Sequence, residues 1–171
     1  MKIILFRHGP AEARDPARWP EDAERPLTPR GEKRTRLAAL GLRRIERSIG
    51  RLMTSPFKRA DRTARILSRV LEIEPVETVA VLAPGGSAKK IIEALNSAPR
   101  VDTIVVVGHQ PDLGTLAGLL LFNSNEALLS IKKAGACGIR FESAVHPGGG
   151  KLEWVAPPNM LCRLTRRKAA V

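Results

Sequence analysis

Short apolar runs and amphipathic stretches alternate along most of this chain. Four runs predict strands: residues 2–7 (KIILFR), 51–56 (RLMTSP), 75–82 (PVETVAVL) and 102–109 (DTIVVVGH). The last has three consecutive valines after an isoleucine. Continuous apolarity of this kind is typical of a central strand that is buried on both faces of a parallel sheet.

Helix signals follow these strands, whereas residues 9–27 predict a loop. Thr28 is suited to an N-cap and Pro29 to the first helical turn, so a helix is expected from there to about Ser48 or Gly50. Its expected apolar face consists of Leu37, Ala38, Leu40, Leu42 and Ile45. Further helices are predicted over residues 57–71, 88–97 and 113–121.

Two strands then follow each other without a helix between them, at residues 136–142 and 151–157. The whole pattern predicts an α/β protein, a three-layer αβα sandwich with a mostly parallel central sheet of about six strands and one antiparallel edge strand. No linker or repeat divides the chain, so residues 1–171 are expected to form a single domain. The tail RRKAAV is expected to fray.

The charge balance is strongly basic, with 29 Lys and Arg against 17 Asp and Glu and a net charge of +12. Such a balance favours anionic partners, although many of these cations are expected to coat solvated helix faces. The low aromatic fraction of 4% makes a nucleic-acid partner unlikely. The sequence shows neither a signal peptide nor a membrane span, and Cys137 and Cys162 read as reduced thiols, so we expect a cytoplasmic protein without a membrane partner.

Basic and imidazole side chains follow three of the predicted strands. The first strand ends at Arg7 and His8. The second leads through Ser55 to Arg59 at the start of a helix, and the most apolar strand ends at His109. Because ligands bind beyond the carboxyl ends of parallel strands, these residues are expected to meet at one edge of the sheet. Each alone has an ordinary structural explanation, but together they predict a site.

This combination of groups suits phosphoryl transfer. Two guanidinium groups can bind phosphoryl oxygens through charge-assisted hydrogen bonds, and a neutral imidazole can attack phosphorus. The second imidazole can stabilise the charge on the equatorial oxygens. The chain has no metal-ligand spacing and no phosphate-binding loop of the Gly-x-x-x-x-Gly-Lys-Ser/Thr type, so neither a metal nor another cofactor is expected. The third histidine, His146, is interpreted as a loop residue without a catalytic role.

Four segments in this order resemble the signatures of the histidine phosphatase superfamily, which has the phosphoglycerate mutase-like fold. They are LFRHGPAE (5–12), RPLTPRGEKRT (25–35), TSPFKRADRTA (54–64) and VVGHQP (106–111). The resemblance implies that His8 is the nucleophile that becomes phosphorylated. It also implies a phosphate pocket formed by Arg7, Arg59, His109 and the backbone N–H of Gln110.

Within this superfamily the short chain is most similar to the SixA-type phosphohistidine phosphatases, which have a minimal cap. Other members carry an acidic proton donor after the third strand or directly after the second histidine. Here the third strand leads to LAPGGSAKK, and Gln110 follows His109. An alkoxide leaving group needs a proton donor, whereas the imidazole of phosphohistidine is easily protonated near neutral pH. The expected substrate is therefore a phosphohistidine on a signalling protein.

Two alternatives remain open from the sequence. The chain is a small-molecule phosphomonoesterase that acts on a phosphorylated metabolite if Glu12, Glu24 or Asp112 supplies a proton. It is a non-catalytic basic module that binds an acidic partner or nucleic acid if the charge of +12 is its only functional feature.

Overall fold

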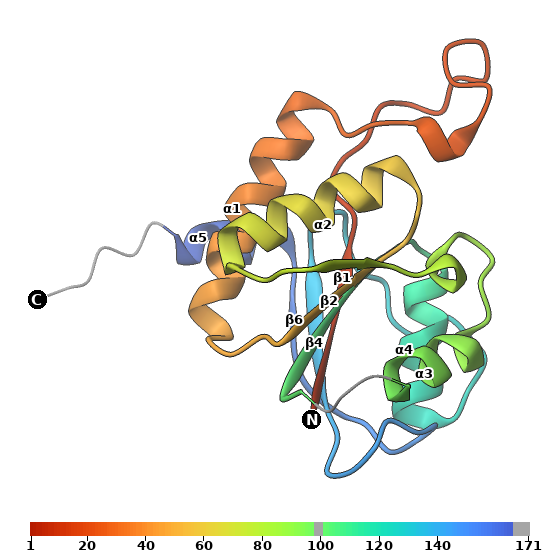
Figure 1. Ribbon diagram of the computed structural model, residues 1–171, viewed down its shortest axis with the longest axis vertical. Coiled ribbons are helices and arrows are strands. Elements are labelled where there is room, and N and C mark those ends of the chain that lie inside the picture. The colour runs from red at the N-terminus through yellow and green to blue at the C-terminus, as the bar shows by residue number, and fades with distance from the viewer. Residues whose placement is uncertain (98–100, 166–171) are drawn as a thin grey trace, which may run out of the picture.

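One mixed sheet organises the residues that the computed structural model describes, 1–97 and 101–165 (Figure 1). Its strands are β1 (Lys2–Arg7), β2 (Arg51–Thr54), β3 (Val76–Thr78), β4 (Thr103–Gly108), β5 (Ala136–Arg140) and β6 (Lys151–Ala156). They hydrogen-bond in the order β3-β2-β4-β1-β5-β6. The four strands β1 to β4 run parallel to one another, which confirms the predicted α/β fold with a mostly parallel sheet of six strands.

The sequence predicted an antiparallel strand at the edge of the sheet. The antiparallel strand is instead β5, which lies one position inside the edge strand β6. β5 pairs antiparallel with β1 on one side and with β6 on the other. The edge strand β6 therefore runs in the same direction as β1. Consecutive strands without a helix between them pair as a hairpin, and here the first of the two also joins the parallel sheet.

Helices cover both faces of the sheet and complete the three layers. They are α1 (Pro29–Ile45), α2 (Lys58–Leu71), α3 (Ala88–Asn96), α4 (Asp112–Phe122) and α5 (Pro158–Leu164). Alternate residues of β1 separate the two cores, as expected for a strand buried on both faces. Ile4 and Phe6 pack with α1, α2 and α5, whereas Ile3 and Leu5 pack with α3 and α4. Figure 1 shows these two groups of helices on opposite sides of the sheet.

The N-terminus of α1 forms as its sequence predicts, but the helix ends earlier than expected. The Thr28 hydroxyl accepts a hydrogen bond from the N–H of Gly31 at 2.9 Å. At the other end, Glu46 already has an extended backbone. Its carboxylate binds the ammonium of Lys2 at 2.6 Å and lies 3.3 Å from Nε1 of Trp154. These contacts with the sheet end the helix at Ile45, before Ser48 or Gly50.

The predicted apolar face of α1 was only partly right. Ala38 and Leu42 are fully buried and Leu37 is half-buried, but Leu40 and Ile45 are exposed. The buried face is instead made largely of small residues: Gly31, Thr35, Ala38, Ala39 and Gly41. Small side chains let a helix approach its neighbours closely, so the larger apolar residues at the margins of the face remain in contact with solvent.

The close neighbour of α1 is α5, a helix that the sequence analysis did not predict. Its seven residues are too few to establish a helical period. A Cβ atom built on Gly41 would lie 2.0 Å from the carbonyl oxygen of Leu161, so the backbones of the two helices are in contact there. Leu161 itself is fully buried.

The other helices and strands begin and end within about two residues of the predicted positions, except for the third strand. The run 75–82 divides into β3 and a 3-10 turn, Ala80–Leu82, because β3 pairs only with the short strand β2. A second 3-10 turn, Asp22–Glu24, interrupts the loop that precedes α1. The tail RRKAAV lies outside the described residues. Among the residues that are described, every helix is too short or too polar to span a membrane.

Candidate active site

His8 directly follows β1 and has a defined tautomer. Its side chain is 5% exposed, and its Nδ1 lies 2.7 Å from the carbonyl oxygen of Gly9. A carbonyl can only accept, so Nδ1 carries the proton and Nε2 keeps its lone pair. Its backbone N–H donates to the carbonyl of Gly108, which links the end of β1 to the end of β4.

The Gly9 carbonyl that orients His8 is itself held between two helices. The N–H of Gly9 donates to the hydroxyl of Thr63 on α2 at 3.0 Å. On the other side, a Cβ atom at this position would lie 2.2 Å from the hydroxyl of Thr35 on α1. Glycine is therefore required for the close approach, and the loop after β1 is fixed relative to both helices.

His109, after β4, faces His8 across the carboxyl edge of the sheet. The two ring centroids are 5.1 Å apart, and the ring planes are inclined by 53°. His109 is 3% exposed, and its Nε2 lies 2.8 Å from the hydroxyl of Ser55, which follows β2. Its Nδ1 is buried and has no hydrogen-bond partner in the described part of the chain. Three strand ends thus meet, as predicted from the parallel sheet.

Arg59, in the first turn of α2, is 4% exposed, and both of its terminal nitrogens donate hydrogen bonds. Its Nη1 donates to the backbone carbonyl of Asp22 at 2.7 Å, and its Nη2 donates to the carboxylate of Asp22 at 2.8 Å. The guanidinium also lies over the ring of Phe57, 4.9 Å from its centroid. Its Nε is buried without a protein partner among the described residues.

Arg7 has a similar arrangement at the end of β1. Its Nη1 donates to the carbonyl of Ile131 at 2.9 Å, and its Nε is buried without a partner in the described chain. Buried donors are normally satisfied, so each exception calls for an explanation, such as a catalytic role or a bound ion. The unpartnered nitrogens of Arg7, Arg59 and His109 are suited to an anion with several acceptor oxygens.

The electrostatics keep both imidazoles neutral. Burial, followed by the charges of His109, Arg59 and Arg7, lowers the pKa of His8 to about 3, although the hydrogen bond to Gly9 opposes this shift. Burial is also the main reason why the pKa of His109 is lowered to about 3, and nearby arginines add to it. A neutral His8 with a free Nε2 has the form that a nucleophile requires.

The sequence analysis missed two further cations near the site, Arg25 and Lys133. Arg25 binds the carboxylate of Asp22 through Nε at 2.8 Å. The pKa of Lys133 lies below its ordinary value, first through partial loss of hydration and then through repulsion by neighbouring cations. These cations are Arg7, Arg25 and Arg59. Both missed residues lie in irregular segments, where periodicity carries no signal. Arg25 was visible as part of the segment RPLTPRG.

Asp22 is the carboxylate bound to this cationic cluster, and the sequence analysis missed it too. Burial raises its pKa, but hydrogen bonds from Arg25 and Arg59 and their charges outweigh burial, so the pKa lies below its ordinary value. Asp22 is therefore ionised near neutral pH and has no proton to donate.

The acidic residues considered as proton donors are engaged elsewhere. The carboxylate of Glu12 lies 3.5 Å from Arg18, that of Glu24 lies 3.4 Å from Lys58, and that of Asp112 accepts from the N–H of Gly85. The side-chain amide of Gln110 donates to Leu129, while the predicted role of its backbone N–H stays a prediction. Within residues 1–97 and 101–165, no three His, Cys, Asp or Glu side chains are grouped so that they could hold a metal ion. His146 lies in an exposed loop.

Comparisons with known proteins agree with this geometry. Residues 3–83 match the family profile described as the histidine phosphatase superfamily (branch 1). An uncharacterised protein of Picosynechococcus sp. is 40% identical over 84% of this chain and 87% of its own length. The phosphohistidine phosphatase SixA of Escherichia coli is 27% identical over 99% of both chains.

Solved structures extend the likeness. The protein histidine phosphatase SixA complexed with tungstate has a TM-score of 0.81 and 25% identity, with 93% of this chain and 98% of that chain covered. A mycobacterial glucosyl-3-phosphoglycerate phosphatase shares the fold, with a TM-score of 0.68, 15% identity, and 91% and 98% of the two chains covered.

The chain therefore belongs to the histidine phosphatase superfamily, and its fold matches SixA. It is a phosphatase. The alternative of a non-catalytic basic module is set aside on this ground. The catalytic roles of His8, Arg7, Arg59 and His109 remain predictions, which the following proposal takes up.

Proposed function

We propose that this protein is a metal-independent phosphohistidine phosphatase that acts on phosphorylated signalling proteins through a covalent phosphohistidine intermediate at His8. The observation that carries the proposal is the fixed, neutral His8, whose Nδ1 is bound to the Gly9 carbonyl and whose ring faces His109 at 5.1 Å. The cytoplasmic location of the protein stays a prediction.

The proposed reaction has two halves. The lone pair on Nε2 of His8 attacks phosphorus, and the bond between phosphorus and the substrate imidazole breaks. The electron pair stays on the substrate nitrogen, which takes a proton from solvent. Water then attacks the phosphorus on His8 and gives up a proton, which releases inorganic phosphate and restores the imidazole. The side chains of Arg7, Arg59 and His109 would bind the phosphoryl oxygens in both halves.

Within the described residues, no carboxylate has been identified as a proton donor for the leaving group, which favours phosphohistidine over a phosphate ester. Asp22 is held ionised by Arg25 and Arg59, the carboxylate of Glu12 lies 3.5 Å from Arg18, and that of Asp112 accepts from the N–H of Gly85. General acid catalysis is typically worth ~10²–10⁴ in rate, and an alkoxide leaving group depends on it. The imidazole of phosphohistidine does not depend on such a donor, because it is easily protonated near neutral pH.

The short connection after β3 favours a substrate that is itself a protein. The segment between β3 and α3 forms only the short 3-10 turn Ala80–Leu82, so we propose one domain over residues 1–171 with a minimal cap. The named activity of the SixA relative, and the binding of tungstate by SixA, are consistent with an oxyanion pocket for phosphohistidine here.

The second candidate is a small-molecule phosphomonoesterase. It is favoured by the shared fold of the mycobacterial glucosyl-3-phosphoglycerate phosphatase. It requires Glu12, Glu24 or Asp112 to move within about 3 Å of the leaving oxygen.

The test is a substrate panel on wild type and His8→Ala in the presence of EDTA. The panel contains a phosphohistidine peptide, sugar phosphates and p-nitrophenyl phosphate. We expect wild type to prefer the peptide, His8→Ala to lose turnover of all substrates, and rapidly quenched wild type to carry one phosphoryl group on His8. A preference for esters would overturn the substrate class, and an unmodified His8 during full turnover would overturn the mechanism.

A further inference from the structure

A basic groove lies along the first three turns of α1, outside the site described above. It encloses about 640 Å³ and is lined by Pro10, Thr28, Arg30, Lys33, Arg34 and Leu37. We call this the N-terminal groove. Its three cationic side chains are exposed, and none forms an ion pair with a carboxylate of the described residues.

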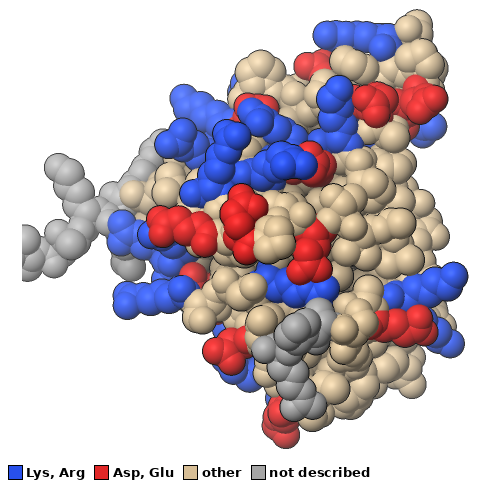
Figure 2. Space-filling model, viewed as in Figure 1, with Lys and Arg blue, Asp and Glu red and all other residues tan. Residues whose placement is uncertain are grey.

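Most cations on the adjacent helix α2 form ion pairs with carboxylates, in contrast to Arg30, Lys33 and Arg34. On α2, Arg62 binds the carboxylate of Glu32 at 2.6 Å and Arg65 binds that of Asp61 at 2.8 Å. Figure 2 shows Lys and Arg side chains gathered over α1 and α2. The N-terminal groove is therefore a region of uncompensated positive charge, which attracts an acidic surface and steers its approach.

The groove is continuous with the loop that carries His8. Pro10 is two residues beyond His8, and its carbonyl accepts a hydrogen bond from the N–H of Thr28 at 3.1 Å. A Cβ atom on Gly31 would lie 1.9 Å from the same carbonyl oxygen, so the first turn of α1 is packed directly on this loop. A protein whose phosphohistidine reaches His8 would place neighbouring residues over the groove.

We propose that the N-terminal groove docks the acidic surface around the phosphohistidine of the protein substrate. The proposal rests on the proposed function and deepens it. Pro10 and Leu37 offer apolar contact, whereas Arg30, Lys33 and Arg34 select acidic side chains. Apolar and charged side chains occur together in this way at transient protein interfaces. The groove lies at the N-terminal end of α1, where the helix dipole also favours anions.

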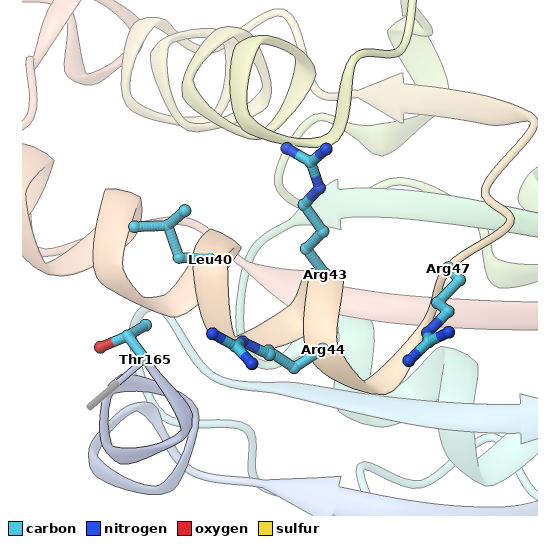
Figure 3. Close-up of a pocket in the computed structure, with 5 residues that line it drawn as sticks. All are labelled: Leu40, Arg43, Arg44, Arg47 and Thr165. Atoms are coloured by element: carbon cyan, nitrogen blue, oxygen red, sulfur yellow. The ribbon is translucent and has the colours of Figure 1, made fainter. Parts of the chain in front are cut away.

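The other end of α1 supplies a matched control. A second cavity, of about 380 Å³, is lined by Leu40, Arg43, Arg44, Arg47 and Thr165 (Figure 3). It also contains three cations, of which Arg43 binds the carboxylate of Glu72 at 3.0 Å, whereas Arg44 and Arg47 form no ion pair with the described residues. It lies about 15 Å further along the helix, at the rise of ~1.5 Å per residue. Its end of the helix points away from the loop of His8, and the dipole there disfavours anions.

The experiment compares two synthetic peptides, each with a phosphohistidine at its centre. One has glutamates on both sides of the phosphohistidine and the other has glutamines. The proteins are wild type, Lys33→Glu/Arg34→Glu and the control Arg44→Glu/Arg47→Glu. Phosphoramidate, which is too small to reach the groove, reports the phosphate pocket alone, and thermal unfolding reports folding. Each pair of substitutions changes the net charge by the same amount.

We expect wild type to prefer the glutamate peptide in kcat/KM, and more strongly at low salt. The Lys33→Glu/Arg34→Glu variant should lose about 3- to 10-fold on that peptide, as expected for a few exposed charge pairs. Its activity on the glutamine peptide and on phosphoramidate should change little. The control variant should keep the preference.

Three results would overturn the inference. Equal turnover of both peptides by wild type would show that acidic neighbours are not recognised, while leaving the proposed function intact. Equal losses in both double variants would assign the effect to net charge. Inhibition of peptide turnover by double-stranded DNA that depends on Lys33 and Arg34, without any preference between the peptides, would assign the groove to nucleic acid. Failure of wild type on every phosphohistidine substrate would instead contradict the proposed function.

Discussion

Asp22 binds both terminal nitrogens of Arg59, one through its backbone carbonyl at 2.7 Å and the other through its carboxylate at 2.8 Å. The same carboxylate accepts from Nε of Arg25. One residue of an irregular loop thus sets the position of a buried guanidinium on α2. Hydrogen bonds that involve charged groups contribute about 1.5–3 kcal/mol to stability. The contact with Asp22 is therefore strong enough to fix the orientation of the Arg59 guanidinium.

Replacement Asp22→Asn should separate binding from chemistry. The substitution keeps the backbone carbonyl but removes the negative charge, so Arg59 and Arg25 become freer and the site becomes more positive. We expect kcat to fall about 10-fold, through the loss of one charge-assisted hydrogen bond. Inhibition by inorganic phosphate should become stronger. Steady-state kinetics with phosphate inhibition measure both effects, and Glu21→Gln, an exposed neighbour, should change neither.

Acid should destabilise the fold through the two buried imidazoles. Their pKa values are lowered from 6.5 to about 3, chiefly by burial. Below pH 6.5 the unfolded chain binds protons that the folded chain excludes. The free energy of unfolding should therefore fall by up to about 1.4 kcal/mol per pH unit for each of His8 and His109 as the pH drops from about 6.5 toward 3.

Urea denaturation at pH 7, 6 and 5 would measure this slope above the range in which most carboxylates titrate. His109→Asn removes one of the two groups and should halve the slope. A slope that is the same in wild type and in this variant would show that His109 is not held neutral by the fold.

Ser55→Ala should weaken catalysis through His109, since the other contact of the hydroxyl, with the N–H of Phe57, is longer at 3.3 Å. The substitution removes the hydroxyl that lies 2.8 Å from Nε2, and Nδ1 of the same ring is also without a protein partner in the described chain. A buried polar atom left unsatisfied costs about 1–3 kcal/mol, so we expect lower stability and a kcat/KM reduced about 10-fold. A double-mutant cycle with His109→Asn is the control. Ser55→Ala should have no further effect on kcat/KM in that background, and additive losses would show an independent role.

Gly41→Ala should destabilise the protein even though alanine favours helices. The added methyl would lie 2.0 Å from the carbonyl oxygen of Leu161, so α1 and α5 would have to move apart. Overpacking of this kind costs about 1–3 kcal/mol, which exceeds the gain of ~1 kcal/mol from helix propensity. Chemical denaturation would measure the loss. Leu40→Ala on the exposed side of the same helix should change stability by less than about 0.5 kcal/mol.

The core of the site could be predicted from the sequence because its residues are tied to regular elements. Arg7, His8 and His109 end strands whose apolar runs are unmistakable, and Arg59 opens a helix after a third. Parallel strands then bring these ends together by geometry alone. Asp22 could not be found in this way, because it lies in a loop whose path depends on the arginines it binds.

The error on α1 has a tertiary cause. Leu40 and Ile45 fit a helical period, but burial was decided by α5, which packs where Gly41 allows contact between backbones. A helix of seven residues is too short for its apolar positions to show a helical period, so the sequence did not predict it. The position of β5 was likewise set by the hairpin with β6 and not by its own composition.

The two sides of α1 separate the demands of folding from those of recognition. The inward side, with Gly31 and Gly41 in contact with neighbouring backbone, tolerates almost no added volume. On the outward side, Arg30, Lys33 and Arg34 are exposed and form no ion pair with the described residues, so their charges can be exchanged at little cost to stability. Under the docking proposed above, substitutions on this one side of α1 would change which acidic protein the enzyme prefers, in evolution or by design, while the residues around His8 and His109 stay the same.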